Sequence, residues 1–165
     1  MPQISDPQAF LEYKLGTALG TERKVRTMLR MMESKASLPE LKQGFARHRE
    51  ETEQQIRNLE QALEGFGGGS AHQDPIIDAI SEHAEQMLGR VGDDLVDGVL
   101  AGGAAHTEHH EIATYEGLIT LASAMGQEDV VALLTENLEQ EQRTLREIET
   151  VTERLAQSLA TQTTG

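Results

Sequence analysis

The sequence predicts an all-α fold, in which four long helices form two antiparallel hairpins that one long connection joins. Three observations predict it. Ala, Leu, Glu and Gln, which favour helices, are abundant, whereas aromatic residues make up only 3% of the chain. Apolar residues recur along four long segments with the spacing of one helix face. Glycine and proline separate these segments, and the length of 165 residues suits a single domain, residues 1–165.

The first hairpin has clear boundary signals. Asp6 is an acid at a capping position and a proline follows it, so we expect a helix over about 7–36. Ser37, with Glu40 three residues later, has the spacing of a capping box and predicts a second helix over about 38–65. A glycine-rich stretch then ends that helix.

The connection and the second hairpin carry the same kinds of signal. Asp74 precedes a proline and opens a short crossover helix over about 75–88. Two further helices are expected over about 93–124 and 128–159, with Gly126 as a left-handed stop between them. Tight links thus join the helices within each hairpin, whereas about 25 residues separate the two hairpins. This connectivity is that of a ferritin-like four-helix bundle.

Composition excludes several classes of protein. The chain has no cysteine, so disulfides and thiolate sites are excluded and any metal must be bound by Glu, Asp, His or water. The formal net charge of -14 disfavours nucleic acid and anionic membranes as partners. The N-terminal sequence lacks a basic region followed by an apolar one, and no apolar run approaches the roughly 20 residues of a membrane span. We therefore expect a cytoplasmic protein.

Ionisable residues interrupt the apolar face of every long helix. On helical wheels these side chains fall on or beside the apolar stripes, whereas neighbouring acids point to water. In chain order these six ionisable residues are Glu22, His48, Glu51, Glu108, Glu111 and Glu141. Glu51 lies at the flank of its stripe, and His110 faces away from the stripe of the third long helix.

The spacing of the acids is matched between the two hairpins. Glu22 and Glu51 are 29 positions apart, and Glu111 and Glu141 are 30 positions apart. If the hairpins are equivalent, four carboxylates therefore meet at one level of the bundle. Ionised carboxylates in a low-dielectric core repel one another, and each costs several kcal/mol to desolvate. Because lysine and arginine are scarce on these stripes, divalent cations are the expected counter-charge.

The types of donor atom favour particular metals. Mixed carboxylate and imidazole ligands suit iron, with manganese as the alternative, and bridging carboxylates suit a pair of ions about 3.5 to 4 Å apart. We expect two ions per subunit, held by the six ionisable residues. Two alternatives stay open at this point. His48 is either a ligand or a hydrogen-bonded core histidine, and Glu108 is either a direct ligand or a hydrogen-bond acceptor for one.

Two stretches resemble segments of a known family. Residues 45–56 read FARHREETEQQI and resemble a His-x-Glu-Glu-Thr-x-x-Gln segment, and residues 108–115 read EHHEIATY and resemble a Glu-His-Tyr-Glu-Ile-Ala segment. Over residues 10–155 the chain is similar to the YciE/YciF-like family of bacterial ferritin-like proteins. The resemblance implies a homodimer of four-helix subunits, a rubrerythrin-like dinuclear metal site and a role in stress responses. The six ionisable residues match the family's pattern, whereas Gln54 and Thr144 stand where the wider di-iron group has histidine.

Three functions are consistent with such a chain. The first is that of a dinuclear iron or manganese protein with oxidase-type or peroxidase-type activity, which reacts with peroxide or oxygen in stress protection. The second is non-catalytic binding of iron. The third is a purely structural role as a stress-associated helical dimer. A dimer encloses no storage cavity, so molecular mass and metal content distinguish these alternatives.

Overall fold

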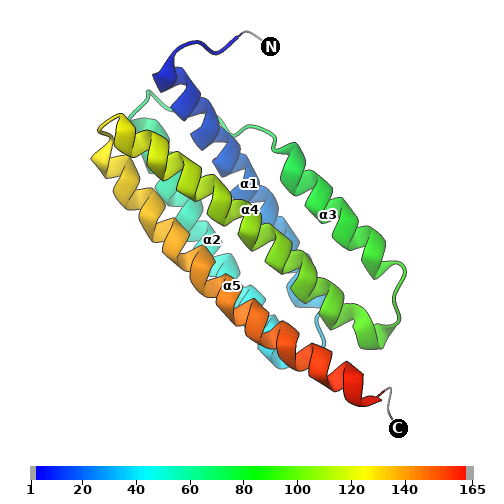
Figure 1. Ribbon diagram of the computed structural model, residues 1–165. Helices are drawn as coiled ribbons and strands as arrows, with labels where there is room; N and C mark the ends of the chain where they lie inside the picture. Colours follow the sequence, from blue (N-terminus) through cyan, green and yellow to red (C-terminus); the bar gives the residue numbers. More distant parts are fainter. Residues whose placement is uncertain (1–2, 163–165) are drawn as a thin grey trace.

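Five α-helices make up most of the chain, which a computed structural model describes over residues 3–162 (Figure 1). Their bounds are Pro7–Lys35 for α1, Pro39–Glu64 for α2, Pro75–Leu88 for α3, Val96–Ala124 for α4 and Glu128–Gln162 for α5; a short 3-10 turn, η1, covers Asp93–Leu95. Within residues 3–162 there is no strand. No helix in that range is both long and apolar enough to cross a membrane. The predicted all-α fold is confirmed.

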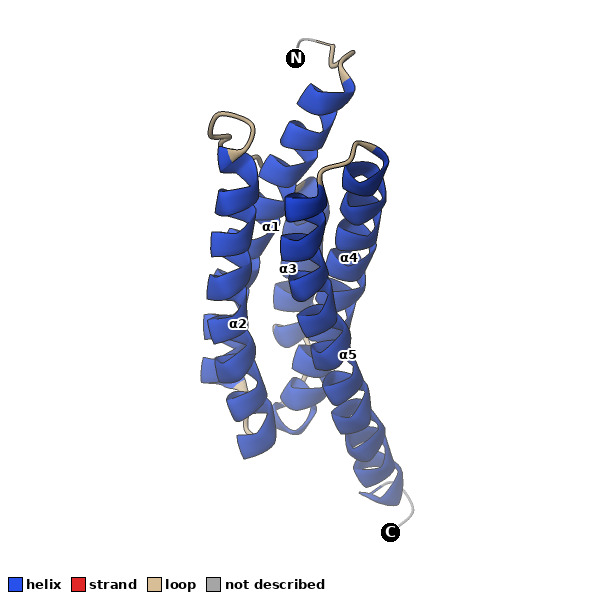
Figure 2. Cartoon of the chain, turned by 90° about the vertical axis from the view of Figure 1, so that its left-hand side faces the viewer, coloured by secondary structure: helices blue, strands red, loops and turns tan. Residues whose placement is uncertain are grey.

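The four long helices form a bundle of two antiparallel hairpins. Helix α1 packs on α2 and α4 packs on α5, while contacts of α1 with α4 and of α2 with α5 close the bundle. Helix α3 lies outside this bundle against α4 and α1 (Figure 1). The segment that contains α3 carries the chain from the end of α2 back to the start of α4. The axes of the long helices are roughly aligned (Figure 2), with neighbouring helices of each hairpin running in opposite directions. The connectivity is the one expected for a ferritin-like bundle.

Side-chain caps begin two helices where the sequence placed them. The Asp6 carboxylate accepts a hydrogen bond from Ala9 N at 2.9 Å, and the Asp74 carboxylate accepts one from Ile76 N at 2.9 Å. Between α4 and α5, Gly126 has a φ of 68°, a left-handed conformation that glycine adopts without steric cost.

The start of α2 differs from the prediction. Ser37 does not cap this helix, because the N-cap is Leu38, whose side chain makes no capping hydrogen bond. Asp97 of α4 instead accepts hydrogen bonds from the backbone N–H groups of Ser37 and Leu38, at 2.8 and 3.0 Å. The capping box was wrong because an acid from a distant helix satisfies these donors. Helix α4 also begins later than expected, after η1, and α5 extends beyond 159 to Gln162.

The connection after α2 is pressed against α1. His72 N donates a hydrogen bond to Gly16 O at 2.8 Å, and the ring of His72 stacks on that of Tyr13 with centroids 4.7 Å apart. A Cβ on Gly20 would lie 1.7 Å from the His72 carbonyl oxygen, so only glycine fits there. This close approach fixes where α3 begins.

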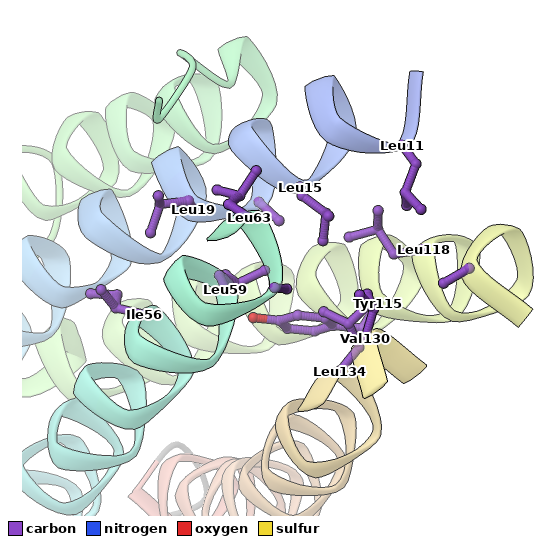
Figure 3. Packing of buried hydrophobic residues seen from close by; sticks show 13 residues of the cluster. Leu11, Leu15, Leu19, Ile56, Leu59, Leu63, Tyr115, Leu118, Val130 and Leu134 are labelled. Atoms are coloured by element: carbon purple, nitrogen blue, oxygen red, sulfur yellow. The ribbon is translucent and has the colours of Figure 1, made fainter. Parts of the chain in front are cut away.

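The apolar core is divided into two clusters. The first, which we call the leucine cluster (Figure 3), is built around Leu11, Leu15, Leu19, Ile56, Leu59, Leu63, Tyr115, Leu118, Val130 and Leu134. The second, which we call the methionine cluster, is built around Val25, Met28, Leu29, Met32, Leu41, Phe45, Leu100, Ala104, Ile148 and Val151. On α1 the leucine cluster ends at Leu19 and the methionine cluster begins at Val25. The inward-facing ionisable residues lie at this boundary.

Candidate metal centre

Four buried ionisable side chains meet between the two apolar clusters. They are His48 from α2, Glu108 and Glu111 from α4, and Glu141 from α5. One potential ligand atom of each lies within 4.8 Å of those of the other three, and none of the four residues is more than 2% exposed. Glu108 and Glu111 share a face because they are three positions apart on one helix. Three different helices therefore supply one group of potential ligands.

Glu22 of α1 lies next to this group of four. The residue is 1% exposed, and its charge is one of the causes that raise the pKa of Glu111. The structure thus brings together five of the six residues that the sequence singled out, namely Glu22, His48, Glu108, Glu111 and Glu141.

The ring of His48 is oriented by groups on both of its sides. Its Nδ1 lies 3.2 Å from Thr144 Oγ1 and 3.4 Å from Glu51 Oε2. Its Nε2 lies 3.2 Å from Glu108 Oε1 and 3.5 Å from Glu141 Oε2. These two contacts lack hydrogen-bond geometry, so Nε2 has no hydrogen-bond partner. The ring therefore presents Nε2 to the carboxylates as a potential metal ligand.

Several carboxylate oxygens of the same region also lack a hydrogen-bond donor. Buried polar atoms nearly always have a partner, because an unpaired one costs about 1 to 3 kcal/mol. The unpaired oxygens here are Glu22 Oε2, Glu108 Oε2, Glu111 Oε1, Glu111 Oε2 and Glu141 Oε2. Carboxylate oxygens combined with one imidazole nitrogen are ligands that iron and manganese accept. The residues present therefore fit a metal ion.

The electrostatics of the centre reflect an excess of carboxylates over donors. Burial and nearby carboxylates raise the pKa of Glu111 and the pKa of Glu141 well above the usual range, and burial raises the pKa of Glu22 to about 7. Burial alone would lower the pKa of His48, but Glu108 and Glu141 outweigh it and raise that pKa well above its usual value. Burial likewise opposes ionisation of Glu108, but the charge of His48 lowers its pKa. Without a metal ion, protons therefore neutralise part of the centre, and a divalent cation would displace them.

Amide and phenol groups support two of the carboxylates. The Tyr115 hydroxyl donates to Glu22 Oε1, and Asn137 Nδ2 donates to that hydroxyl at 3.0 Å. Burial raises the pKa of Tyr115 well above its usual value, so the phenol remains a donor. Gln55 Nε2 donates to Glu141 Oε1. Sequence analysis missed Asn137, although its position four residues before Glu141 on one face of α5 was a usable signal.

Glu51 lies outside the group of four. Its side chain is 21% exposed, and its Oε1 accepts a hydrogen bond from Arg143 Nη2 at 3.0 Å. Hydrogen bonds from His48 and Arg143 lower the pKa of Glu51 to about 2, although partial burial opposes the shift. In this arrangement Glu51 orients the His48 ring instead of joining the other carboxylates. The sequence could not reveal this, because Arg143 is 92 positions away on α5.

Comparisons with known proteins match this architecture. A family model described as "Domain of unknown function (DUF892)" matches residues 6–161. Protein YciF of Escherichia coli (strain K12) is 29% identical over 133 residues, which are 79% of this chain and 80% of YciF. The structure of YcfI from Rhodopseudomonas palustris, described as a candidate structural protein, has a TM-score of 0.87 at 30% identity and covers 90% of this chain and 96% of YcfI. The crystal structure of the E. coli stress protein YciF has a TM-score of 0.88 at 24% identity, and this likeness, over 93% of this chain and 99% of YciF, concerns the fold alone.

Proposed function

The chain belongs to the DUF892 family of YciF-like proteins, and from this premise we propose that it is a dinuclear metal protein, with iron as the metal and manganese as the alternative. The observation that carries the proposal is the set of buried nitrogen and oxygen atoms without hydrogen-bond partners between the two apolar clusters. We assign two ions per subunit to the ligands Glu22, His48, Glu108, Glu111 and Glu141.

The chain's own groups prepare the centre for cations. Glu111 and Glu141, whose pKa values are raised, release protons when cations bind, so metal affinity should increase with pH. Glu51 and Thr144 hold the Nδ1 side of His48 and leave Nε2 for the metal. Iron bound here would supply electrons for the reduction of peroxide or oxygen.

We infer that this reaction protects the cell under stress by consuming ferrous ion and oxidant together. The inference is supported by YciF of E. coli, a relative that is described as a stress protein. We also propose that the chain works as a homodimer. Light scattering should then give a mass near twice the 18.1 kDa of one chain.

Anaerobic titration with ferrous ion tests the proposed metal centre. We expect uptake of about two ions per subunit, followed by near-ultraviolet charge-transfer absorption of ferric ion once peroxide or oxygen is added. Glu111→Gln should weaken binding at least about tenfold. Glu116→Gln is the matched control, because it makes the same change at an exposed position of α4 and should bind like wild type. Absence of uptake by the wild-type protein, or equal uptake by the two variants, contradicts the proposal.

A structural role is the second candidate function. The observation that favours it is the 30% identity with YcfI, a candidate structural protein. In this case the purified protein would retain neither iron nor manganese after reconstitution, and Glu111→Gln would alter stability alone. A non-catalytic iron binder is distinguished from both, since it would take up ferrous ion without accelerating its oxidation.

A further inference from the structure

A cavity of about 350 Å³ between α2 and α5 reaches the candidate metal centre. His48 and Glu108 form its inner end, and both are buried. Arg47 and Glu147 line the cavity at the surface, where their half-exposed side chains form an ion pair between α2 and α5. The cavity therefore connects the outside of the molecule with two side chains that carry unpaired ligand atoms.

The wall of this cavity is largely apolar. Between the surface and the inner end it is lined by residues of the methionine cluster, namely Leu29, Leu41, Phe45, Ala104, Ile148 and Val151. A space of this size holds roughly a dozen water-sized groups at about 30 Å³ each. Small-molecule sites in proteins are typically apolar cavities of about 300 to 1,000 Å³ in which a few polar groups fix the orientation of the ligand. The cavity has this form, with His48 and Glu108 as the polar groups at its inner end and further polar side chains, among them Glu40, Arg47 and Glu147, at the surface.

Hydrogen peroxide and oxygen gain little from such a wall, because each has only two heavy atoms. A carbon skeleton gains about 25 cal/mol for each Å² of apolar surface that it buries. We propose that the peroxide for this centre is an organic hydroperoxide, whose small apolar body fills the cavity and whose –OOH end faces His48 and Glu108. The proposal rests on the proposed function, and it names the substrate class of the same centre.

The reaction balances as a two-electron reduction. The O–O bond of ROOH breaks, two ferrous ions are oxidised to ferric ions, and two protons taken up from the solution complete the products ROH and H2O. The alcohol keeps the apolar body of the substrate, so it should bind in the same cavity. It is therefore a stable probe that does not depend on activity of the iron-loaded protein.

Cumyl alcohol, the product of cumene hydroperoxide, is the probe for binding to the metal-free protein. Gly44 lines the cavity, and a Cβ there meets no atom within 4 Å. Gly44→Leu should thus occupy part of the cavity, and it also favours the helix. Gly117→Leu is the matched control, since Gly117 is an exposed position of α4 at which an added Cβ would likewise meet no atom within 4 Å. Calorimetry should show binding to wild type and Gly117→Leu, and binding at least about tenfold weaker to Gly44→Leu.

Oxidation of the ferrous-loaded proteins provides the second readout. We expect Gly44→Leu to slow oxidation by cumene hydroperoxide at least about tenfold more than it slows oxidation by hydrogen peroxide, whereas Gly117→Leu should leave the ratio of the two rates as in wild type. Failure of cumyl alcohol to bind wild type, or equal binding to all three proteins, overturns the proposal. If the wild-type protein takes up no ferrous ion, the proposed function falls as well. If the wild-type protein takes up ferrous ion and hydrogen peroxide oxidises that iron, but cumyl alcohol does not bind, only the proposal of an organic hydroperoxide as substrate is overturned.

Discussion

Within residues 3–162, a histidine meets carboxylate groups both at the candidate metal centre and in a partly buried cluster around Asp74, and the two places differ in how many donors each carboxylate has. In the Asp74 cluster, Oδ2 lies 2.7 Å from His110 Nε2 and accepts a hydrogen bond from Thr21 Oγ1 at 2.8 Å. Oδ1 accepts one from Ile76 N at 2.9 Å. Burial would raise the pKa of Asp74, but these hydrogen bonds outweigh it and lower that pKa. Each oxygen thus has a donor, and the cluster fastens the start of α3 to α1 and α4.

The metal centre has the opposite balance. One imidazole faces several carboxylates, and both oxygens of Glu111 lack a donor. The pKa of Glu111 is accordingly raised by burial and by its neighbours, whereas that of Asp74 is lowered. A buried histidine beside an acid therefore does not by itself indicate function. The shortage of donors is what distinguishes the candidate metal centre, because a bound cation would supply the partners that these oxygens lack.

The two clusters should differ most in how a substitution in each changes the stabilisation of the protein by metal. A metal ion present at about 100 times its Kd stabilises the folded state by about 2.7 kcal/mol. We expect Asp74→Asn to keep this increment and Glu141→Gln to lose most of it, because only Glu141 belongs to the metal centre. Anaerobic thermal unfolding with and without ferrous ion measures the increment. Equal increments in the two variants would show that the clusters do not differ in this way.

The pH dependence of the metal-free protein should come from the metal centre. The pKa of Glu22 is about 7 in the folded protein and 4.5 ordinarily, so its contribution to stability is lost as the pH rises from about 4.5 through 7. His48 acts in the same direction at higher pH, because its raised pKa gives a contribution that is present below 6.5 and lost above it. The pKa of Asp74 is lowered from 3.8, so its contribution is constant in this range.

The midpoint temperature of the metal-free protein should therefore fall between pH 5 and pH 8. The fall should be smaller in Glu22→Gln, and Asp74→Asn should keep the wild-type slope. Added ferrous ion should counteract the trend, because cations compete with protons for the same atoms. A midpoint that rises over this range without metal would contradict the assignment of raised pKa values to the centre.

Removing a carboxylate from the metal-free protein should have opposite effects at the two clusters. Asp74→Ala leaves the Ile76 N–H without its side-chain acceptor and removes the contacts of Asp74 with Thr21 and His110, which should cost about 1 to 3 kcal/mol. Glu111→Gln removes a buried acid whose oxygens have no donor, so it should raise stability by up to about 1 kcal/mol. Urea unfolding measures both changes. Similar losses of stability in the two variants would contradict the difference between the two clusters.

Helical periodicity was sufficient to find most of the centre, because the burial of a helix face is encoded locally. Glu22, Glu108, Glu111 and Glu141 interrupt apolar stripes in the sequence, and none is more than 1% exposed. The same periodicity, together with the glycine and proline signals, predicted the helices and their connection. Each of these features depends on residues within a few turns of one another.

Partners on distant helices could not be predicted in the same way. His110 faces away from the stripe of α4, yet it meets Asp74 because α3 covers that side of α4. Asp97 caps the start of α2 from α4, where the sequence pointed to Ser37. Arg143 similarly holds Glu51 at the rim of the centre. A helical wheel describes one helix at a time, whereas these contacts depend on how the helices pack against one another.

Glu51 contacts the metal centre only through His48 and should therefore give the smallest effect on metal binding. Glu51→Gln keeps the size of the side chain but removes the charge that His48 Nδ1 and Arg143 face. We expect ferrous affinity to fall about tenfold, since loss of a group that orients a ligand typically costs about 10- to 100-fold. Competition with a chelator measures the change, and Glu50→Gln, at the exposed neighbouring position, should leave the affinity unchanged. If Glu51→Gln weakens ferrous binding as much as Glu111→Gln does, then Glu51 is itself a ligand and leaves Arg143 when the metal binds.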